Sequence, residues 1–371
     1  MVLDKIMLRI SKSDRDRDNW ACFHFTAVNS KPSNMVFDSD SSKPETPSNP
    51  GLTDAQHALQ QLKSWVQSQI IGQDILIERM LIALLADGHL LVEGAPGLAK
   101  TRAINILSQG IEADFHRIQF TPDLLPADLT GTDIYRPQDG SFQFQPGPLF
   151  HNLILADEIN RSPAKVQSAL LEAMAERQVT VGRETYPLPP LFMVMATQNP
   201  LEHEGTYPLP EAQLDRFMLY VRIGYPEPRH ERAILKLART EARHSPVSDF
   251  KPLDQKTLFA ARREIADLYM ADALEEYLVQ LILATRNPAA WGEEPDRWLQ
   301  YGASPRATIA LDRAARAQAW LRGRCYVSPE DIQALAPDIL RHRLILTYEA
   351  EAEGITTDHC IQSLLRRVAV P

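Results

Sequence analysis

GAPGLAKT, residues 94–101, is the stretch that decides the expected fold. It directly follows the apolar run HLLVE and precedes a segment with helical spacing, which is the strand, glycine-rich loop and helix order of a P-loop. Glycines let backbone N–H groups close around phosphate oxygens, and the helix N-terminus adds a favourable dipole. Lys100 would then place its charge on the β- and γ-phosphates, and Thr101 would offer its hydroxyl to Mg²⁺. The expected phosphate-binding residues are Gly94, Ala95, Pro96, Gly97, Leu98, Ala99, Lys100 and Thr101.

One position departs from the strict P-loop pattern. Ala99 precedes the lysine, where glycine is usual. Alanine is small and tolerates a right-handed helical backbone, so we expect the loop to form with Ala99 in that conformation. The simpler alternative is a turn with a solvated lysine. The strand before the loop, Lys100 and Thr101 together favour phosphate binding over that alternative.

Two adjacent carboxylates end a second apolar run, NLILADE, residues 152–158. The run predicts a buried strand, and open parallel sheets bind ligands at the carboxyl ends of their strands. We expect Asp157 to hold the Mg²⁺ shell and Glu158 to polarise the attacking water of a phosphoryl transfer. A strand that enters an acidic loop is the alternative, and the preceding P-loop argues against it.

Further polar residues follow this pair along the chain. Asn199 ends the run MVMATQNP and could hydrogen-bond both the γ-phosphate and the water, although an Asn-Pro turn explains it equally well. Arg216, in LPEAQLDRF, precedes the last predicted strand. Arg306 lies in the first turn of a helix that starts at Ser304-Pro305, where a cation opposes the helix dipole and so indicates an anionic ligand. Ordinary salt bridges are the alternative for both arginines.

Apolar runs of strand length alternate with helical segments in the first part of the chain. This pattern predicts an α/β fold with a parallel five-stranded sheet covered by helices on both faces. After about residue 228 the predicted elements are all helical, which indicates a small all-α domain. We expect a disordered tail over 1–50, an α/β core over 51–228 and a helical lid over 229–371. The expected strands are 89–92, 116–120, 153–156, 192–196 and 218–223, and the expected core helices are 53–69, 75–86, 101–109 and 163–176.

Composition excludes several classes of protein. The 39 Lys and Arg against 48 Asp and Glu give a formal net charge of −9, which does not favour binding to nucleic acid through bulk charge. No apolar run is long enough for a transmembrane helix. The three cysteines, Cys22, Cys325 and Cys360, are too far apart for a disulfide scaffold or a zinc spacing. The tail is rich in Ser, Pro and Asp, and Met35 offers a second candidate start of translation.

These motifs together resemble those of the AAA+ ATPases and, within them, the MoxR family, from about Thr53 to the C-terminus. The resemblance assigns GAPGLAKT to Walker A and ADEINR, residues 156–161, to Walker B. It makes Asn199 sensor 1, Arg216 the arginine finger and Arg306 sensor 2. Gly72 and Gln73, in IIGQD, fall where the family meets the adenine base, and residues 121–131 lead into its helix-2 insert.

The resemblance also implies how such a protein works. We expect a ring, commonly a hexamer, that binds ATP and Mg²⁺ between subunits, with Arg216 reaching the nucleotide of the next subunit and Arg306 serving either subunit. Rotation of the lid would be the mechanical output. The function implied is a cytoplasmic, chaperone-like remodeller or activator of protein complexes, with a von Willebrand factor A domain protein as its partner.

Two segments predict hairpins. Asp139-Gly140 lies between alternating residues in 135–146, and Gly182 lies at a turn in 178–188. Phe142 and Phe144 would share one face of the first hairpin. In the family such insertions project and can touch a client or a neighbouring subunit, whereas the alternative is that the two Phe pack on their own core.

Two other functions compete with this hypothesis. Related AAA+ proteins include motors on nucleic acid, and a group of lid arginines keeps that alternative open. The third candidate is a switch that binds ATP without hydrolysing it, although Glu158 and Arg216 argue against it. The lid arginines are Arg313, Arg316, Arg322 and Arg324.

Overall fold

The computed structural model describes residues 51–138, 140–200, 205–242 and 250–371. The predicted tail, residues 1–50, and Asp139 of the predicted Asp-Gly turn lie outside the described residues. Residues 47–371 form one compact unit. No helix in the described part of the chain combines the length and the apolar character needed to cross a bilayer.

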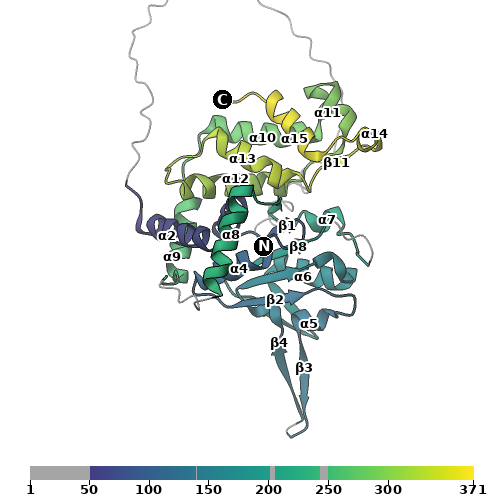
Figure 1. Cartoon of the computed structure of the whole chain (residues 1–371). Helices are drawn as coiled ribbons and strands as arrows, with labels where there is room; N and C mark the ends of the chain where they lie inside the picture. Colours follow the sequence, from purple (N-terminus) through teal and green to yellow (C-terminus); the bar gives the residue numbers. More distant parts are fainter. Residues whose placement is uncertain (1–50, 139, 201–204, 243–249) are drawn as a thin grey trace, which may run out of the picture. The chain divides into compact units, whose positions relative to one another are not determined.

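Five parallel strands form the central sheet in the order β2-β5-β8-β1-β9. Figure 1 labels β1, β2 and β8 of this sheet. The predicted fold is therefore confirmed, and every predicted strand begins and ends within two residues of an observed one. The strands are β1 (Leu90–Glu93), β2 (Phe115–Gln119), β5 (Leu153–Asp157), β8 (Met193–Gln198) and β9 (Leu219–Arg222).

The inner strands β1, β5 and β8 are buried on both faces, which explains why they are continuous apolar runs, whereas the edge strand β2 exposes Arg117 and Gln119. Successive side chains of a strand point to opposite faces. In β8, Met193 and Met195 join one hydrophobic cluster, whereas Val194 and Ala196 join the other. A polar face on one of these inner strands would leave one of the two clusters incomplete.

The predicted core helices each begin and end within one residue of the observed ones. They are α2 (Asp54–Gln69), α3 (Asp74–Leu85), α4 (Lys100–Gln109) and α6 (Ala164–Glu176), joined by the short helices α5 (Pro126–Thr130) and α7 (Glu211–Leu214) and the 3-10 turns η1 (Pro148–Phe150) and η2 (Ile159–Arg161). Helix α2 starts with a capping box. Thr53 Oγ1 accepts from the Gln56 amide at 3.2 Å, and the Gln56 side chain accepts from the Thr53 amide at 3.0 Å.

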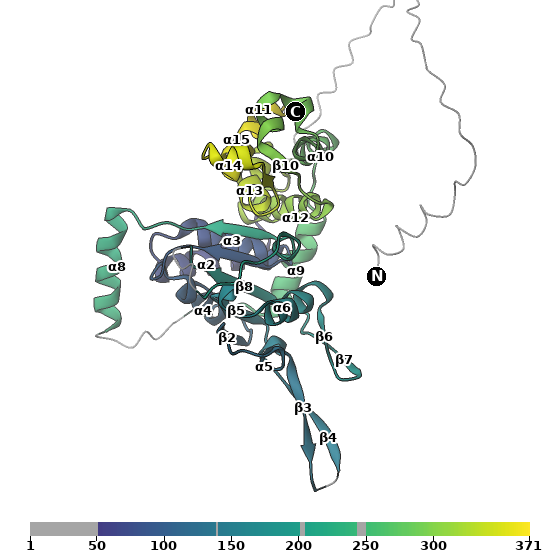
Figure 2. The ribbon, with the colours of Figure 1, turned by 90° about the vertical axis from the view of Figure 1, so that its right-hand side faces the viewer.

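Two hairpins lie side by side and project from the sheet (Figure 2). In the first, the register pairs Tyr135 with Phe142 and Asp133 with Phe144, so the two Phe share a face. Phe144 stacks on Tyr186 of the second hairpin with ring centroids 4.0 Å apart, whereas Phe142 is 71% exposed. One Phe thus packs internally and the other faces solvent. The hairpins are β3 (Gly131–Arg136) with β4 (Ser141–Pro146), and β6 (Gln178–Val181) with β7 (Glu184–Pro187).

After β9, the regular elements among the described residues are helices and one small ribbon. An antiparallel pair, β10 (Leu299–Tyr301) and β11 (Ile345–Leu346), was not predicted, because two or three residues are too few to show a strand pattern. The division at residues 228 and 229 stays a prediction. The helices are α8 (Pro228–Glu241), α9 (Gln255–Ala266), α10 (Asp272–Arg286), η3 (Pro288–Trp291), α11 (Glu293–Trp298), α12 (Pro305–Leu321), α13 (Pro329–Leu340), α14 (Tyr348–Ala352) and α15 (Thr357–Arg367).

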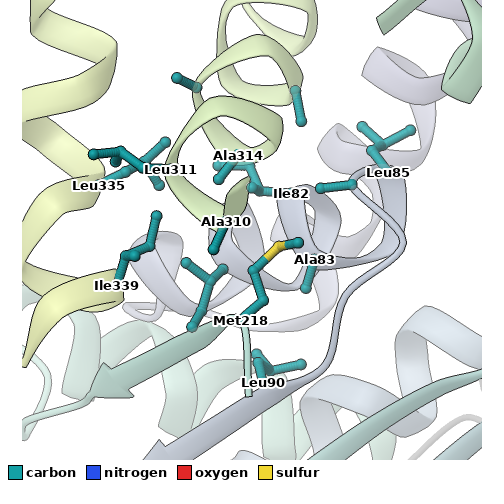
Figure 3. Packing of buried hydrophobic residues seen from close by; sticks show 14 of the residues in the cluster. Ile82, Ala83, Leu85, Leu90, Met218, Ala310, Leu311, Ala314, Leu335 and Ile339 are labelled. Atoms are coloured by element: carbon teal, nitrogen blue, oxygen red, sulfur yellow. The ribbon is translucent and has the colours of Figure 1, made fainter. Parts of the chain in front are cut away.

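Helices α12 and α13 pack directly on α3 and on the start of β9. One hydrophobic cluster runs through all of these elements (Figure 3). Ala310 and Ala314 of α12 and Ala83 of α3 are all buried in this cluster, and such small side chains let helix backbones approach closely. Helices α12 and α13 thus pack on the sheet domain through an apolar cluster, beside which Arg79 of α3 pairs with Asp338 of α13 at 2.6 Å.

Candidate functional site

The predicted phosphate loop joins β1 to α4. Gly97 has a φ of +83°, and a Cβ built there would meet no described atom within 4 Å. Glycine is therefore favoured here by the positive φ and not by crowding around the side-chain position. Lys100 Nζ donates to the Gly94 carbonyl at 2.6 Å and lies 3.4 Å from the Gln198 carbonyl oxygen. The lysine thus lies between the loop and the carboxyl end of β8.

Ala99 corrects one expectation. Its φ of 60° and ψ of 20° are left-handed, so the prediction of a right-handed backbone is wrong. A left-handed conformation brings Cβ close to the following carbonyl oxygen and costs an L-residue about 1–2 kcal/mol. Glycine is usual here because it has no Cβ, and alanine carries the smallest side chain that creates the conflict.

The carboxylates Asp157 and Glu158 lie at the carboxyl end of β5, as predicted. Asp157 is buried; its Oδ1 accepts from Thr197 Oγ1 at 2.5 Å, and its Oδ2 accepts from Arg117 at 2.7 Å. Glu158 has a left-handed φ of 57°, and its backbone N–H donates to Thr197 Oγ1 at 3.0 Å. Residues held in such strained conformations cluster at functional sites.

Two residues of this site were missed from the sequence. Gln119 Nε2 donates to Glu158 Oε2 at 2.8 Å, and Arg117 pairs with Asp157. Both follow from the pairing of β2 with β5, which places Gln119 opposite Asp157. The alternation of Arg117 and Gln119 in the predicted strand was the available signal, because a polar face at the end of a buried sheet must meet polar neighbours.

Three adjacent strands bring the predicted groups together. Strands β5, β8 and β1 run parallel, so their carboxyl ends meet at one edge of the sheet. The phosphate loop with Lys100, the carboxylates Asp157 and Glu158, and the buried Asn199 all follow these ends. The arrangement can hold an anion, a cation and a polarised water next to one another.

A pocket of about 300 Å³ lies beside the loop. The predicted adenine segment lines it, and Gln73 Nε2 donates to the Gly224 carbonyl at 3.3 Å, while Gly72 has a φ of +80°. Arg102 links two elements of the pocket wall: it forms an ion pair with Glu241 of α8 and donates to the Gln69 carbonyl of α2 at 3.1 Å. The apolar lining suits a planar base. It includes Ile70, Ile71, Pro96, Leu98, Tyr225, Pro226, Ile234, Leu237 and Ala238.

The residues present fit a nucleotide with Mg²⁺. Asp157 contributes a carboxylate and Thr101 a hydroxyl, which are the hard oxygen donors that Mg²⁺ takes beside phosphate oxygens and water. Thr101 lies in the first turn of α4, directly after Lys100. The positive charge, the backbone amides and the oxygen donors therefore share one edge of the sheet.

The two predicted arginines lie elsewhere. Strand β9 pairs parallel with β1, Leu219 opposite Leu90, so Arg216 precedes the amino end of β9 while the phosphate loop follows the carboxyl end of β1. Arg216 donates to the Leu171 carbonyl of α6 at 2.9 Å and lines an open cavity of about 500 Å³. Arg306 is exposed and lies 3.3 Å from Asp215, the residue before Arg216.

The basic group of the lid is largely neutralised by neighbouring carboxylates. Arg316 pairs with Asp312 at 2.7 Å, and both Arg322 and Arg324 pair with the buried Asp331. Arginines committed to carboxylates offer little charge to a phosphate backbone. The structure therefore weakens the nucleic-acid alternative.

The comparisons with known proteins agree with this geometry. A family model described as "ATPase family associated with various cellular activities (AAA)" matches residues 89–219, and a model of the AAA lid domain matches residues 296–364. The chain is 47% identical over 322 residues to Chaperone MoxR1 of Mycobacterium tuberculosis, covering 86% of this chain and 84% of that protein. It is 33% identical to Protein MoxR of Methylorubrum extorquens, covering 86% of this chain and 97% of that protein.

A solved structure extends the similarity to the fold. A crystal structure of a presumed ATPase from Cytophaga hutchinsonii matches with a TM-score of 0.77 and 48% identity, covering 85% of this chain and 96% of that one. The same sheet, loop and lid thus recur across most of both chains. The chain belongs to the MoxR family of AAA ATPases.

Proposed function

We propose that the chain hydrolyses ATP to ADP and phosphate in sites shared between the subunits of a ring, commonly a hexamer. One observation carries the proposal. Lys100, Asp157 and Glu158 gather at the carboxyl end of the sheet, whereas Arg216 precedes the amino end of β9. An arginine there is separated from the phosphate loop of its own subunit by the length of the strands. We therefore propose that it contacts the nucleotide of a neighbouring subunit.

Each residue of the site has a role in this reaction. The backbone amides of residues 94–99 and Lys100 bind the phosphates, and Gly72 and Gln73 border the base. Thr101 and Asp157 hold Mg²⁺, which neutralises phosphate charge when bound. Glu158 orients the attacking water and accepts its proton, and Asn199 hydrogen-bonds the water and the γ-phosphate.

Arg216 and Arg306 would complete the site from the next subunit. They stabilise the negative charge that the transferring phosphoryl group develops, and a finger of this kind contributes about 10³–10⁵-fold to the rate. The contact of Arg306 with Asp215, next to Arg216, supports its action on the same neighbouring nucleotide.

The biological role that we propose is based on the names of similar proteins. One relative is named a chaperone, and we propose that this chain likewise remodels or activates a protein complex in the cytoplasm, with a von Willebrand factor A domain protein as its partner. A motor on nucleic acid and a switch without hydrolysis remain the alternatives to be tested. Turnover of ATP excludes the switch, and a steep salt-dependent affinity for DNA would favour the motor.

Mixed rings test the shared site. Arg216→Ala and Lys100→Ala should each abolish turnover, and Arg216→Ala should still bind ATP. A random one-to-one mixture restores a complete site at about a quarter of the interfaces, because one variant keeps the phosphate loop and the other keeps the finger. Activity that stays at the level of the separate variants at every mixing ratio would refute a finger supplied in trans.

A further inference from the structure

We propose that Asp215 is a positioning residue. It links the lid to the arginine finger and keeps Arg216 and Arg306 next to each other, where both can reach the nucleotide of the neighbouring subunit. The proposal rests on the proposed function, because it assumes that Arg216 completes the site of another subunit.

The carboxylate of Asp215 is shared by three groups from the lid. Its Oδ1 accepts from Arg343 Nε at 2.7 Å, and its Oδ2 accepts from Ser304 Oγ at 2.9 Å and from Arg306 at 3.3 Å. The Asp215 side chain is 15% exposed and that of Arg343 is 2% exposed. A buried guanidinium needs a paired carboxylate, so Asp215 is the counter-ion that permits Arg343 to lie there.

The residues that follow α13 hold the backbone on the other side of the finger. Arg343 donates to the Phe217 carbonyl at 2.7 Å, and His342 Nε2 donates to the same oxygen at 3.1 Å. Arg341 donates to the Tyr220 carbonyl at 2.5 Å. We call residues 341–343 the lid clamp.

The clamp fixes the chain on both sides of Arg216. Asp215 precedes the finger and Phe217 follows it, and both are bound by the same guanidinium of Arg343. Helix α12 brings Ser304 and Arg306 to the other oxygen of Asp215. Any shift of the lid therefore moves the finger backbone with it.

The two arginines on Asp215 differ in how firmly they are held. Arg343 is enclosed and makes several short contacts, whereas Arg306 is 60% exposed and makes one contact of 3.3 Å. Exposed ion pairs are weak, so Arg306 can exchange Asp215 for phosphate oxygens at little cost. Asp215 thus keeps Arg306 beside Arg216 until a neighbouring nucleotide is present.

Two variants distinguish the effect of the Asp215 charge from the effect of the position of its carboxylate. Asp215→Asn removes the counter-ion, and Asp215→Glu keeps it but lengthens the side chain by one methylene. Asp358→Asn is the matched control: Asp358 accepts from Arg341 at 2.8 Å, and after the substitution Arg341 still pairs with Asp338 at 2.9 Å. For each variant, kcat, KM and the affinity for ATP would be measured, with circular dichroism to monitor folding.

We expect both Asp215 variants to lower kcat by about 10–100-fold, as misplacement of a catalytic group by about 1 Å does, with ATP affinity within twofold of wild type. Asp358→Asn should keep the wild-type kcat. Mixing either Asp215 variant with Lys100→Ala should restore turnover, and mixing it with Arg216→Ala should not, because both defects then lie in the finger. If Asp215→Asn fails to fold, Asp215→Glu decides the question.

The outcomes distinguish this inference from the proposed function. Wild-type protein without turnover would overturn both. Turnover that depends on Arg216 but is unchanged in the Asp215 variants would overturn the inference alone. Loss of turnover that Lys100→Ala cannot rescue would show that Asp215 serves its own phosphate loop, which also overturns it.

Discussion

The left-handed backbone of Ala99 makes the phosphate loop a place where one substitution should stabilise the protein. Ala99 has a φ of 60° and a ψ of 20° directly before α4. Replacing it by glycine relieves about 1–2 kcal/mol of steric strain. Glycine also gives the unfolded chain more conformational entropy, which destabilises the folded protein by about 0.4–1 kcal/mol. We therefore expect Ala99→Gly to raise the free energy of unfolding by about 0.5–1 kcal/mol.

Two control substitutions in the same segment should change the free energy of unfolding in the opposite direction. Gly97→Ala places a Cβ on a residue whose φ is +83° and should destabilise by about 1–2 kcal/mol, since no described atom crowds the added methyl group. Ala103→Gly, one turn into α4 and fully buried, should destabilise by about 1 kcal/mol or more. The two changes from alanine to glycine thus have opposite signs.

Urea unfolding, followed by circular dichroism at fixed protein concentration without nucleotide, measures all three. The midpoint should rise for Ala99→Gly and fall for the other two, with the slope m unchanged. A lower midpoint for Ala99→Gly, comparable with that of Ala103→Gly, would refute the reasoning. It would mean that Ala99 behaves as an ordinary helical residue in solution.

Three further predictions concern the chemistry, the pH dependence and the hairpins. Glu158→Gln should lower ATP turnover by about 10²–10⁴-fold while ATP stays bound, and unchanged turnover would remove Glu158 from its role. Burial and, to a smaller degree, the positive charge of Arg177 together lower the pKa of His89 from 6.5 to about 3. The buried ring is thus neutral when folded but gains a proton in the unfolded chain below pH 6.5. The free energy of unfolding should then fall with decreasing pH by up to about 1.4 kcal/mol per unit, and His89→Gln should flatten that slope in urea titrations. Tyr186→Ala removes the stack between the two hairpins, which is worth about 1 kcal/mol, so limited proteolysis should cut the hairpins faster than in wild type. Tyr135→Ala, which removes only the exposed pair with Phe142 within one hairpin, should have the smaller effect.

Most of the sheet could be predicted because its signals are local. The strands buried on both faces are continuous apolar runs, and the phosphate loop carries glycines, a lysine and a threonine at set spacing. The carboxylates and Asn199 could be placed because they end neighbouring strands. These predictions need only the periodicity of each element and the rule that parallel strands end together.

The remainder depends on contacts between residues far apart in the chain. The clamp of Arg343 on Asp215 joins positions 128 residues apart, and nothing in the local sequence of either marks the pair. Gln119 reaches Glu158 only because β2 lies beside β5. The conformation of Ala99 follows from the path of the loop and overrides the residue's own preference. The ribbon of β10 and β11 is too short to leave a pattern.

Hydrolysis of ATP between subunits can be tested by measuring ATP turnover against protein concentration in the presence of Mg²⁺. Sizing of the same samples with and without ATP reports the assembly. We expect a specific rate that rises with protein concentration and levels off as a ring-sized species forms in the presence of ATP. A monomer whose specific rate is independent of concentration and unaffected by Arg216→Ala would contradict it.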